Sequence, residues 1–344
     1  MSRATGIGAA WFLGVLALVT LGISAAARVQ TVLTLFELAV LVLIGVLVIW
    51  NAHAAPVAAF SWSWFSPSSL GTFDAFSAGM VVAVFLYLGW DASANLAEET
   101  QNPHLKAGLG GIVGVFAIFL LFVLLQVAAQ MALPADDIRA NSANLLPVLG
   151  RIALPGFWSA LAILAVLISA IATLETQLLQ CTRLLFSMAR DGVIGESMGR
   201  LRPRFQTPWL AGFAVGAVSL LLFAASATAP TINQIMSDLI NAVGVQVSFY
   251  YAVAGFACAW YYRKAMFSDW RIFALAGIFP LLSALFVGSI GLYQLPHLGW
   301  RVGAISVGTI LIGLAPLVYY RRLYRSRFYT DPPEQAPAYV SSAS

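Results

Sequence analysis

Long apolar runs recur along the whole chain and restrict its possible folds more than any other feature. A transmembrane helix needs about 20 consecutive apolar residues, and a window of that length finds nine such runs in the 344 residues. The short alternating segments typical of a β-barrel are not found. We therefore predict an all-α membrane protein. The nine runs are 7–27, 31–50, 76–97, 109–133, 157–183, 209–228, 235–262, 272–293 and 299–321.

Composition and charge agree with this class and predict a topology. Hydrophobic residues make up 60% of the chain and charged residues 9%. With nine spans, 14 of the 18 Lys and Arg residues fall in loops on one side. By the positive-inside rule that side is cytoplasmic, which places the C-terminus inside and Met1 outside. Because the basic residues are divided among short loops, we expect no nucleic-acid partner.

No motif for an enzyme, a metal or a cofactor is found. The three histidines lack metal-ligand spacing, and neither a phosphate-binding glycine loop nor a nucleophile–base pair is present. Cys181 and Cys258 lie in apolar runs, where we expect them to fill space. We predict a non-enzymatic, multi-pass protein of a bacterial cell membrane, with no cofactor and with the lipid bilayer as its surroundings. The oligomeric state is left open.

The spans are expected to form one transmembrane domain at residues 1–330. The longest loop on the outer side, 134–156, has an apolar spacing that fits either a short surface helix or a simple linker. Residues 331–344, DPPEQAPAYVSSAS, are rich in Pro, Ser and Ala, so we predict a disordered cytoplasmic tail there.

The segment 76–101 contains polar residues where a membrane helix should continue. An α-helix over 76–88 rises only about 20 Å, against about 30 Å of hydrocarbon. Gly89 weakens the helix, and Asp91 and Ser93 favour helix starts. We predict a discontinuous helix, two half-helices joined by unwound backbone; the alternative is a continuous helix with a kink. Unwound backbone at membrane depth lines a cavity, as in the binding sites of secondary transporters.

Four sequence blocks resemble the amino acid–polyamine–organocation (APC) superfamily of amino acid permeases. FLYLGWDASANLAEETQNP resembles the sixth helix, and ATLETQLLQCTRLLFSMARDG followed by RPRFQTPW resembles the eighth helix and its loop. ARVQTVLTLFELAVLVLIG is similar to the fifth helix and SFYYAVAGFACAWYYRK to the tenth. The resemblance implies a LeuT-type fold, in which unwound parts of the first and sixth helices form the substrate site.

The chain departs from the family pattern at its start. Family members have about twelve helices, and this sequence begins near the family's fourth helix. We therefore expect an N-terminally truncated fold that lacks about the first three helices. The implied function is secondary active transport of an amino acid or related amine by alternating access, coupled to H⁺. The alternative is a truncated, transport-inactive membrane protein.

The unwound stretch supplies the predicted substrate-binding residues. Asp91 could meet a substrate amine or cap a half-helix, and Trp90 could be a gate or a packing residue. The full prediction is Tyr87, Leu88, Gly89, Trp90, Asp91 and Ser93.

Two further predictions concern polar groups inside other spans. Glu37 lies two turns into its helix, about 10 Å from the cytoplasmic edge, and is predicted to carry the coupling proton or to hold a structural hydrogen bond. Some proton-coupled members of the family that this chain resembles have a Lys near this point. A polar stripe on the 157–183 helix is expected to line the transport path or to join helices by hydrogen bonds. The stripe is Ser169, Thr173, Thr176, Gln177 and Gln180.

Overall fold

The computed structural model of the chain is built of helices, with no strand among the residues that it describes. The predicted tail at 331–344 lies outside those residues. The chain divides into two compact units, which are described separately. The described residues are 3–21, 23–97, 100, 102–142, 144–202, 207–226, 232–323 and 326–330.

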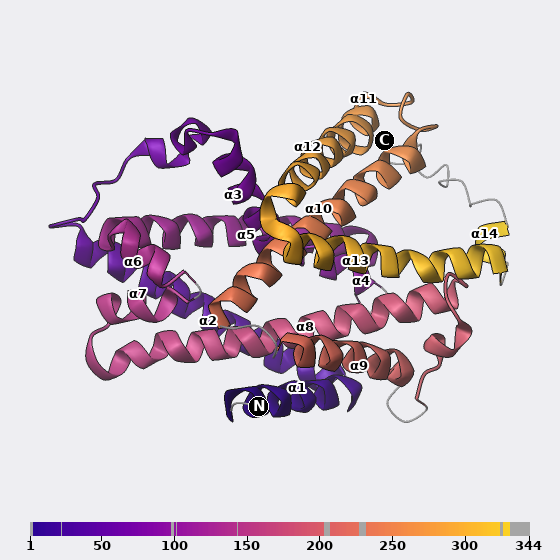
Figure 1. The fold of residues 1–344 in the computed structure, drawn as a ribbon, viewed down its shortest axis with the longest axis horizontal. Helices are drawn as coiled ribbons and strands as arrows, with labels where there is room; N and C mark the ends of the chain where they lie inside the picture. The colour runs from indigo at the N-terminus through magenta and orange to yellow at the C-terminus, as the bar shows by residue number, and fades with distance from the viewer. Residues whose placement is uncertain are drawn as a thin grey trace. The chain divides into compact units, whose positions relative to one another are not determined.

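The first unit consists of residues 1–62, 89–190 and 195–230. In Figure 1, α8 runs beside α9, and α1 packs against both. The helices of this unit are α1 (Arg3–Leu21), α2 (Ile23–Ala52), α4 (Ala92–Asn95), α5 (Pro103–Ala132), α6 (Ala135–Ala140), α7 (Leu146–Ala153), α8 (Ala160–Arg190) and α9 (Trp209–Ser226), with the turns η4 (Gly156–Ser159) and η5 (Glu196–Gly199). A further turn, η1 (Trp62–Phe65), begins at the last residue of the opening segment.

The second unit consists of residues 63–88, 191–194 and 231–344. Its centre is α10, which packs against α3, α12 and α13. The helices are α3 (Phe73–Leu86), α10 (Ile232–Tyr262), α11 (Trp270–Ile272), α12 (Phe279–Gln294), α13 (Gly299–Val318) and α14 (Arg327–Thr330), with the 3-10 turns η2 (Pro67–Leu70) and η7 (Leu295–Leu298) and the π-helical stretches η6 (Phe273–Ile278) and η8 (Tyr319–Leu323).

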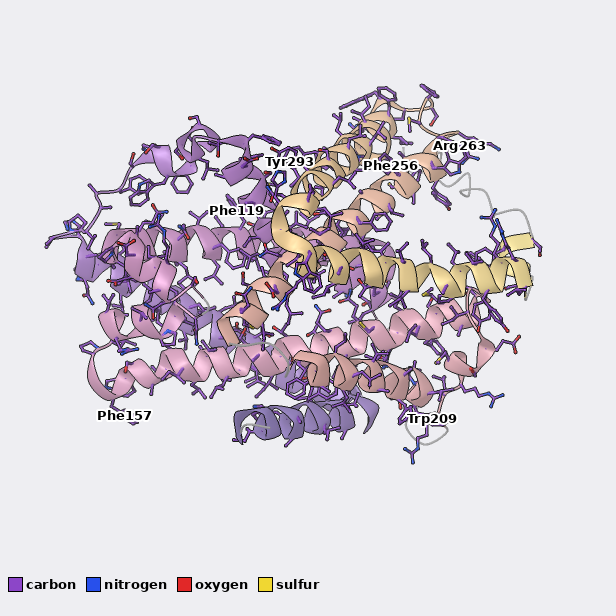
Figure 2. The ribbon with its side chains drawn as sticks, viewed as in Figure 1. Phe119, Phe157, Trp209, Phe256, Arg263 and Tyr293 are labelled. Atoms are coloured by element: carbon purple, nitrogen blue, oxygen red, sulfur yellow. The ribbon has the colours of Figure 1, made fainter. Side chains whose placement is uncertain are left out.

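Each of the nine predicted spans overlaps a helix or a helix pair of the described chain. Five helical stretches of the described chain are long and apolar enough to cross a membrane, and three shorter apolar helices accompany them. Large apolar side chains are exposed on the helices, among them Phe119, Phe157 and Trp209, which Figure 2 labels. The protein is therefore an all-α, multi-pass membrane protein, in which lipid can cover these side chains.

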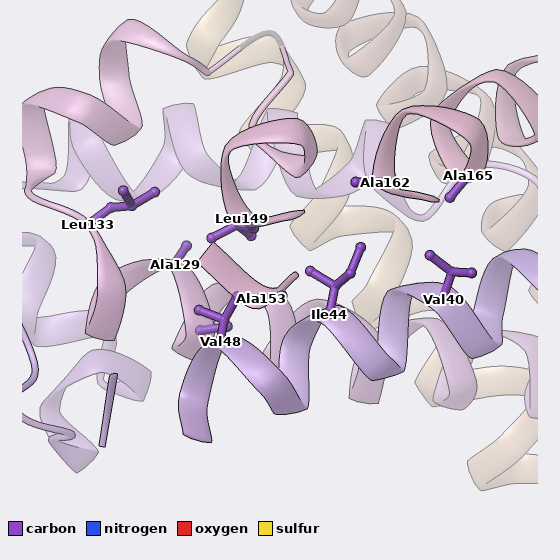
Figure 3. Close-up of a cluster of buried hydrophobic side chains, with 10 residues drawn as sticks. Val40, Ile44, Val48, Ala129, Leu133, Leu149, Ala153, Ala162 and Ala165 are labelled. Atoms are coloured by element: carbon purple, nitrogen blue, oxygen red, sulfur yellow. The ribbon is translucent and has the colours of Figure 1, made fainter. Parts of the chain in front are cut away.

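Small side chains allow the first unit to pack closely. Val40, Ile44 and Val48 recur every fourth residue on α2 and form one buried face (Figure 3). That face meets Ala128 and Ala129 of α5, together with alanines of α7 and α8. Of the two alternatives for the loop 134–156, the structure has a helix: α7 packs into this cluster with Leu149 and Ala153 buried.

The second unit is held by a close approach of α3 and α10. Val81 of α3 is fully buried with Val245 of α10 and Ile290 of α12. A Cβ atom on Gly244 of α10 would lie 2.5 Å from the carbonyl oxygen of Val81, so only glycine fits there. The half-helix α3 begins with the Thr72 hydroxyl accepting a hydrogen bond from the Ala75 N–H at 3.2 Å.

Candidate functional site

The predicted break in the helix is confirmed. α3 ends at Leu86 and α4 begins at Ala92, so the intervening residues are not helical. Gly89 has φ +115°, a conformation that L side chains rarely adopt. The predicted site residues Tyr87 and Leu88 belong to the second unit, and the other four belong to the first.

Asp91 is buried and held by α8. Its Oδ2 accepts a hydrogen bond from Nε2 of Gln180 at 3.0 Å, and the two residues are 6% and 8% exposed. Asp91 makes no side-chain capping bond to α4, so the capping alternative does not describe its side chain here. The Oε1 atom of Gln180 is buried and has no hydrogen-bond partner among the described residues. A buried acceptor of this kind calls for a donor from water or a ligand.

The unwound segment also packs against α5. A Cβ atom on Gly111 would lie 3.2 Å from the Trp90 carbonyl oxygen and 3.3 Å from the Ser93 hydroxyl. That hydroxyl donates a hydrogen bond to the same carbonyl at 2.9 Å. Gly111 was not predicted as a site residue. The available signal was the glycine-rich start of this helix, GLGG at 108–111, because small residues allow close backbone approach in membranes.

Two residues of the polar stripe of α8 lie beside the unwound segment. Besides the Gln180 bond, a Cβ atom on Gly89 would lie 4.0 Å from Nε2 of Gln177. Cys181, the next residue after the stripe, is exposed, so the prediction that it fills space is wrong. Its thiol lies within electrostatic range of the Asp91 carboxylate. Gln177, Gln180 and Cys181 therefore surround the unwound segment on the α8 side.

The N-terminal part of the stripe is hydrogen-bonded to α2. Gln30 of α2 donates from Nε2 to the Thr176 hydroxyl and to the Ala172 carbonyl, both at 3.1 Å. Glu37 of α2 is hydrogen-bonded to the Ser169 side chain. The remaining stripe residue, Thr173, is exposed. Gln30 was missed because one glutamine near the start of a helix gives no periodic signal.

Glu175 lies on another face of α8. It is 3% exposed, and Ile171 and Leu178 on the same face pack with Val15 and Val19 of α1. Its Oε1 atom accepts no hydrogen bond from any described residue.

The break and most of the polar stripe lie within the sequence blocks that resemble amino acid permeases, and a comparison with known families tests that resemblance. The sequence profile described as "Amino acid permease" matches residues 2–314. The chain belongs to the amino acid permease family. This membership covers both units and accords with the APC-type fold expected from the blocks.

Several curated relatives of this family member are from Bacillus subtilis. The chain is 26% identical to the branched-chain amino acid permease BcaP over 89% of its own length and 61% of the relative's. It is 25% identical to the serine/threonine exchanger SteT over 93% of its own length and 69% of the relative's. A methylthioribose transporter is 26% identical over 59% of the chain and 43% of its own length. The chain thus spans about three fifths of the branched-chain permease that it matches.

Proposed function

We propose that the protein carries out secondary active transport of an amino acid or related amine by alternating access, coupled to H⁺. The family membership and the relatives named as permeases and exchangers support transport in preference to an enzymatic reaction. The observation that carries the proposal is the buried Asp91–Gln180 pair beside unwound backbone. Such breaks expose backbone donors and acceptors at membrane depth.

The substrate amine binds next to Asp91 in this proposal. A carboxylate stabilises an ammonium group most strongly where water is excluded, and Asp91 is buried. The Oε1 atom of Gln180 accepts a second hydrogen bond from the same ammonium group. Gly89 leaves its backbone open to the substrate, while Trp90 and Ser93 line the segment. Tyr87 and Leu88 complete the binding segment at the end of α3.

The coupling proton is carried by Glu37. Its carboxyl lies inside a membrane-spanning helix and is hydrogen-bonded to Ser169 of the polar stripe. Ionisable groups inside membrane spans often serve as proton carriers. Thr173, Thr176 and Gln177 continue the stripe from this point to the unwound segment, so the proposed proton and substrate positions share one face of α8.

The orientation is proposed from loop charge. The basic loops between the spans lie on the cytoplasmic side of a bacterial cell membrane, and the C-terminus lies on that same side.

Uptake into proteoliposomes tests the proposal. The protein is prepared with and without any coding sequence that precedes Met1, and is given branched-chain amino acids, serine, threonine and a cationic amino acid. Asp91→Asn removes the charge that holds the amine, and Gly89→Leu puts a side chain on a φ of +115°. Both are expected to reduce uptake at least tenfold, since each tenfold is about 1.4 kcal/mol of lost binding.

Matched controls separate transport from folding. Asp136→Asn changes an exposed acidic residue of α6, and Gly303→Leu changes a helical glycine with nothing within 4 Å of a Cβ atom. All four variants are expected to insert normally, as measured by detergent gel filtration. Wild-type uptake by both Asp91→Asn and Gly89→Leu would contradict the proposed site, and no uptake by either wild-type preparation would favour the transport-inactive alternative.

A further inference from the structure

A second group of polar contacts joins the start of α3 to the end of α12. The Tyr293 hydroxyl donates a hydrogen bond to Oδ1 of Asp74 at 2.5 Å, across 219 residues of sequence. The Tyr293 ring also meets the Phe73 ring edge-on, with centroids 4.8 Å apart. Figure 2 labels Tyr293 on α12. His297 stacks on the same Tyr293 ring, with centroids 5.0 Å apart, and its Nδ1 is 2.9 Å from the Tyr293 carbonyl oxygen.

The next residue adds a buried hydrogen bond. Gln294 is 3% exposed, and its Nε2 donates to the fully buried Ser77 hydroxyl at 2.5 Å and to the Asp74 carbonyl at 3.3 Å. Each neutral hydrogen bond of this kind shifts the equilibrium between its made and broken states about two- to tenfold, and a bond to a charged group shifts it more. We call the contacts of Asp74 and Ser77 with Tyr293 and Gln294 the α3–α12 latch.

The latch acts on a helix with a fixed point near its middle. At Val81 the α3 backbone is so close to Gly244 of α10 that no side chain fits between them. Asp74 lies seven residues before Val81 and Leu88 seven residues after it, about 10 Å in each direction. A rigid half-helix that tilts about this point moves its two ends in opposite directions by similar amounts. The latch therefore sets the position of the end at which α3 unwinds.

We propose that Tyr293 and Gln294 are positioning residues that hold the half-helix α3 in one of two tilts, and that opening of the α3–α12 latch moves the unwound end of α3. This inference rests on the proposed function, because the two tilts correspond to the two access states of a transporter. Under the proposed orientation the latch lies at the outer end of α3. In this proposal the open latch belongs to the outward-facing access state.

Distances between spin labels test the latch without any transport assay. Labels are placed at Ser69→Cys, just before α3, and Arg301→Cys, at the start of α13, in a background of Cys181→Ser and Cys258→Ala. The protein is measured in lipid nanodiscs by pulsed electron resonance. Tyr293→Phe removes one hydroxyl and keeps the ring. We expect the population of longer distances to rise about two- to tenfold, the change in equilibrium that one hydrogen bond produces.

Two comparisons make the result specific. Tyr261→Phe removes the hydroxyl of another exposed tyrosine in the same unit, for which no side-chain hydrogen bond is seen in the described residues, and should leave the distances unchanged. Asp74→Asn keeps an acceptor for Tyr293 and should stay near the wild type, whereas Asp74→Ala should match Tyr293→Phe. The double variant Asp74→Ala with Tyr293→Phe should open no further than either single variant.

Transport kinetics give a second measurement. If more molecules expose the site to the outside, the apparent KM of Tyr293→Phe for external substrate falls about two- to tenfold, a gain that a folding defect would not produce. Identical distance distributions for wild type, Tyr293→Phe and Asp74→Ala would overturn the latch. If Tyr293→Phe lengthens the distances but the wild type transports nothing, the latch stands and the proposed function is overturned.

Discussion

Gly111 offers a direct test of how the unwound segment is supported. In the structure a Cβ atom at this position would be 3.2 Å from the Trp90 carbonyl oxygen and 3.6 Å from Cε3 of the Trp90 ring. Alanine therefore requires the segment to move by a few tenths of an ångström. Valine adds two more methyl groups on the same side. Such overpacking costs about 1 to 3 kcal/mol if the segment stays in place.

The cost is expected to appear in substrate binding. An isolated Gly-to-Ala change in a helix gains about 1 kcal/mol of stability, which offsets much of the strain of Gly111→Ala. The thermal stability of that variant should stay near the wild type. If the segment shifts to relieve the contact, substrate binding weakens by the strain energy, and 1 to 3 kcal/mol corresponds to roughly 5- to 150-fold in affinity. We expect the smaller value for alanine and the larger for valine.

The assay is the KM for uptake together with the melting temperature. Gly114 is the matched control, because it lies one turn further along α5 and nothing lies within 4 Å of a Cβ atom placed on it. Gly110→Ala is an intermediate case, with an ordinary contact of 3.7 Å to the Ser93 side chain. If Gly111→Val and Gly114→Val have the same KM, the α5 support does not position the binding segment, and the reasoning is refuted.

Three more outcomes follow from the site. Uptake driven by an inward proton gradient rises as external pH falls. Glu37→Gln should remove this dependence, whereas Ser169→Ala should keep it. If Glu37→Gln still shows pH-driven uptake, Glu37 does not carry the proton. Gln180→Leu removes the donor to buried Asp91, which costs about 1 to 3 kcal/mol, so substrate affinity measured by equilibrium binding should fall at least fivefold. Maleimide should label Cys181, which is exposed beside this pair, and substrate should slow the labelling; a rate indifferent to substrate would place the binding segment elsewhere.

The sequence predicted those features that depend on local chemistry. The spans follow from apolar length, because lipid leaves a chain few options besides a continuous helix. The break follows from Gly89 and Asp91, which weaken a helix wherever they occur. The α8 stripe follows from the 3.6-residue period, and the Gln180 bond to Asp91 agrees with that face.

What the sequence missed depends on partners distant along the chain. Gly111 matters only because the Trp90 carbonyl lies against it, and nothing in the glycine-rich start of α5 names that neighbour. The bond from Tyr293 to Asp74 joins residues 219 positions apart, and each looked like an ordinary helix-end residue. Gln30 was likewise visible only once α2 was packed on α8.

The hydrogen bonds between α2 and α8 also fix how these two helices are aligned. Gln30 meets Thr176, and Glu37, seven residues later, meets Ser169, seven residues earlier. The helices are therefore antiparallel, and their two polar pairs are two turns apart, about 10 Å.

With this alignment, a shift of α8 along α2 keeps polar side chains facing each other in one direction only. If α8 moved one turn along α2, about 5.4 Å, Glu37 would come to Thr173 and Gln30 to Gln180, so both would meet polar side chains of the same stripe. One turn in the opposite direction would bring both to alanines. Six polar side chains, two on α2 and four on α8, thus give this helix pair a second polar-matched register on one side only.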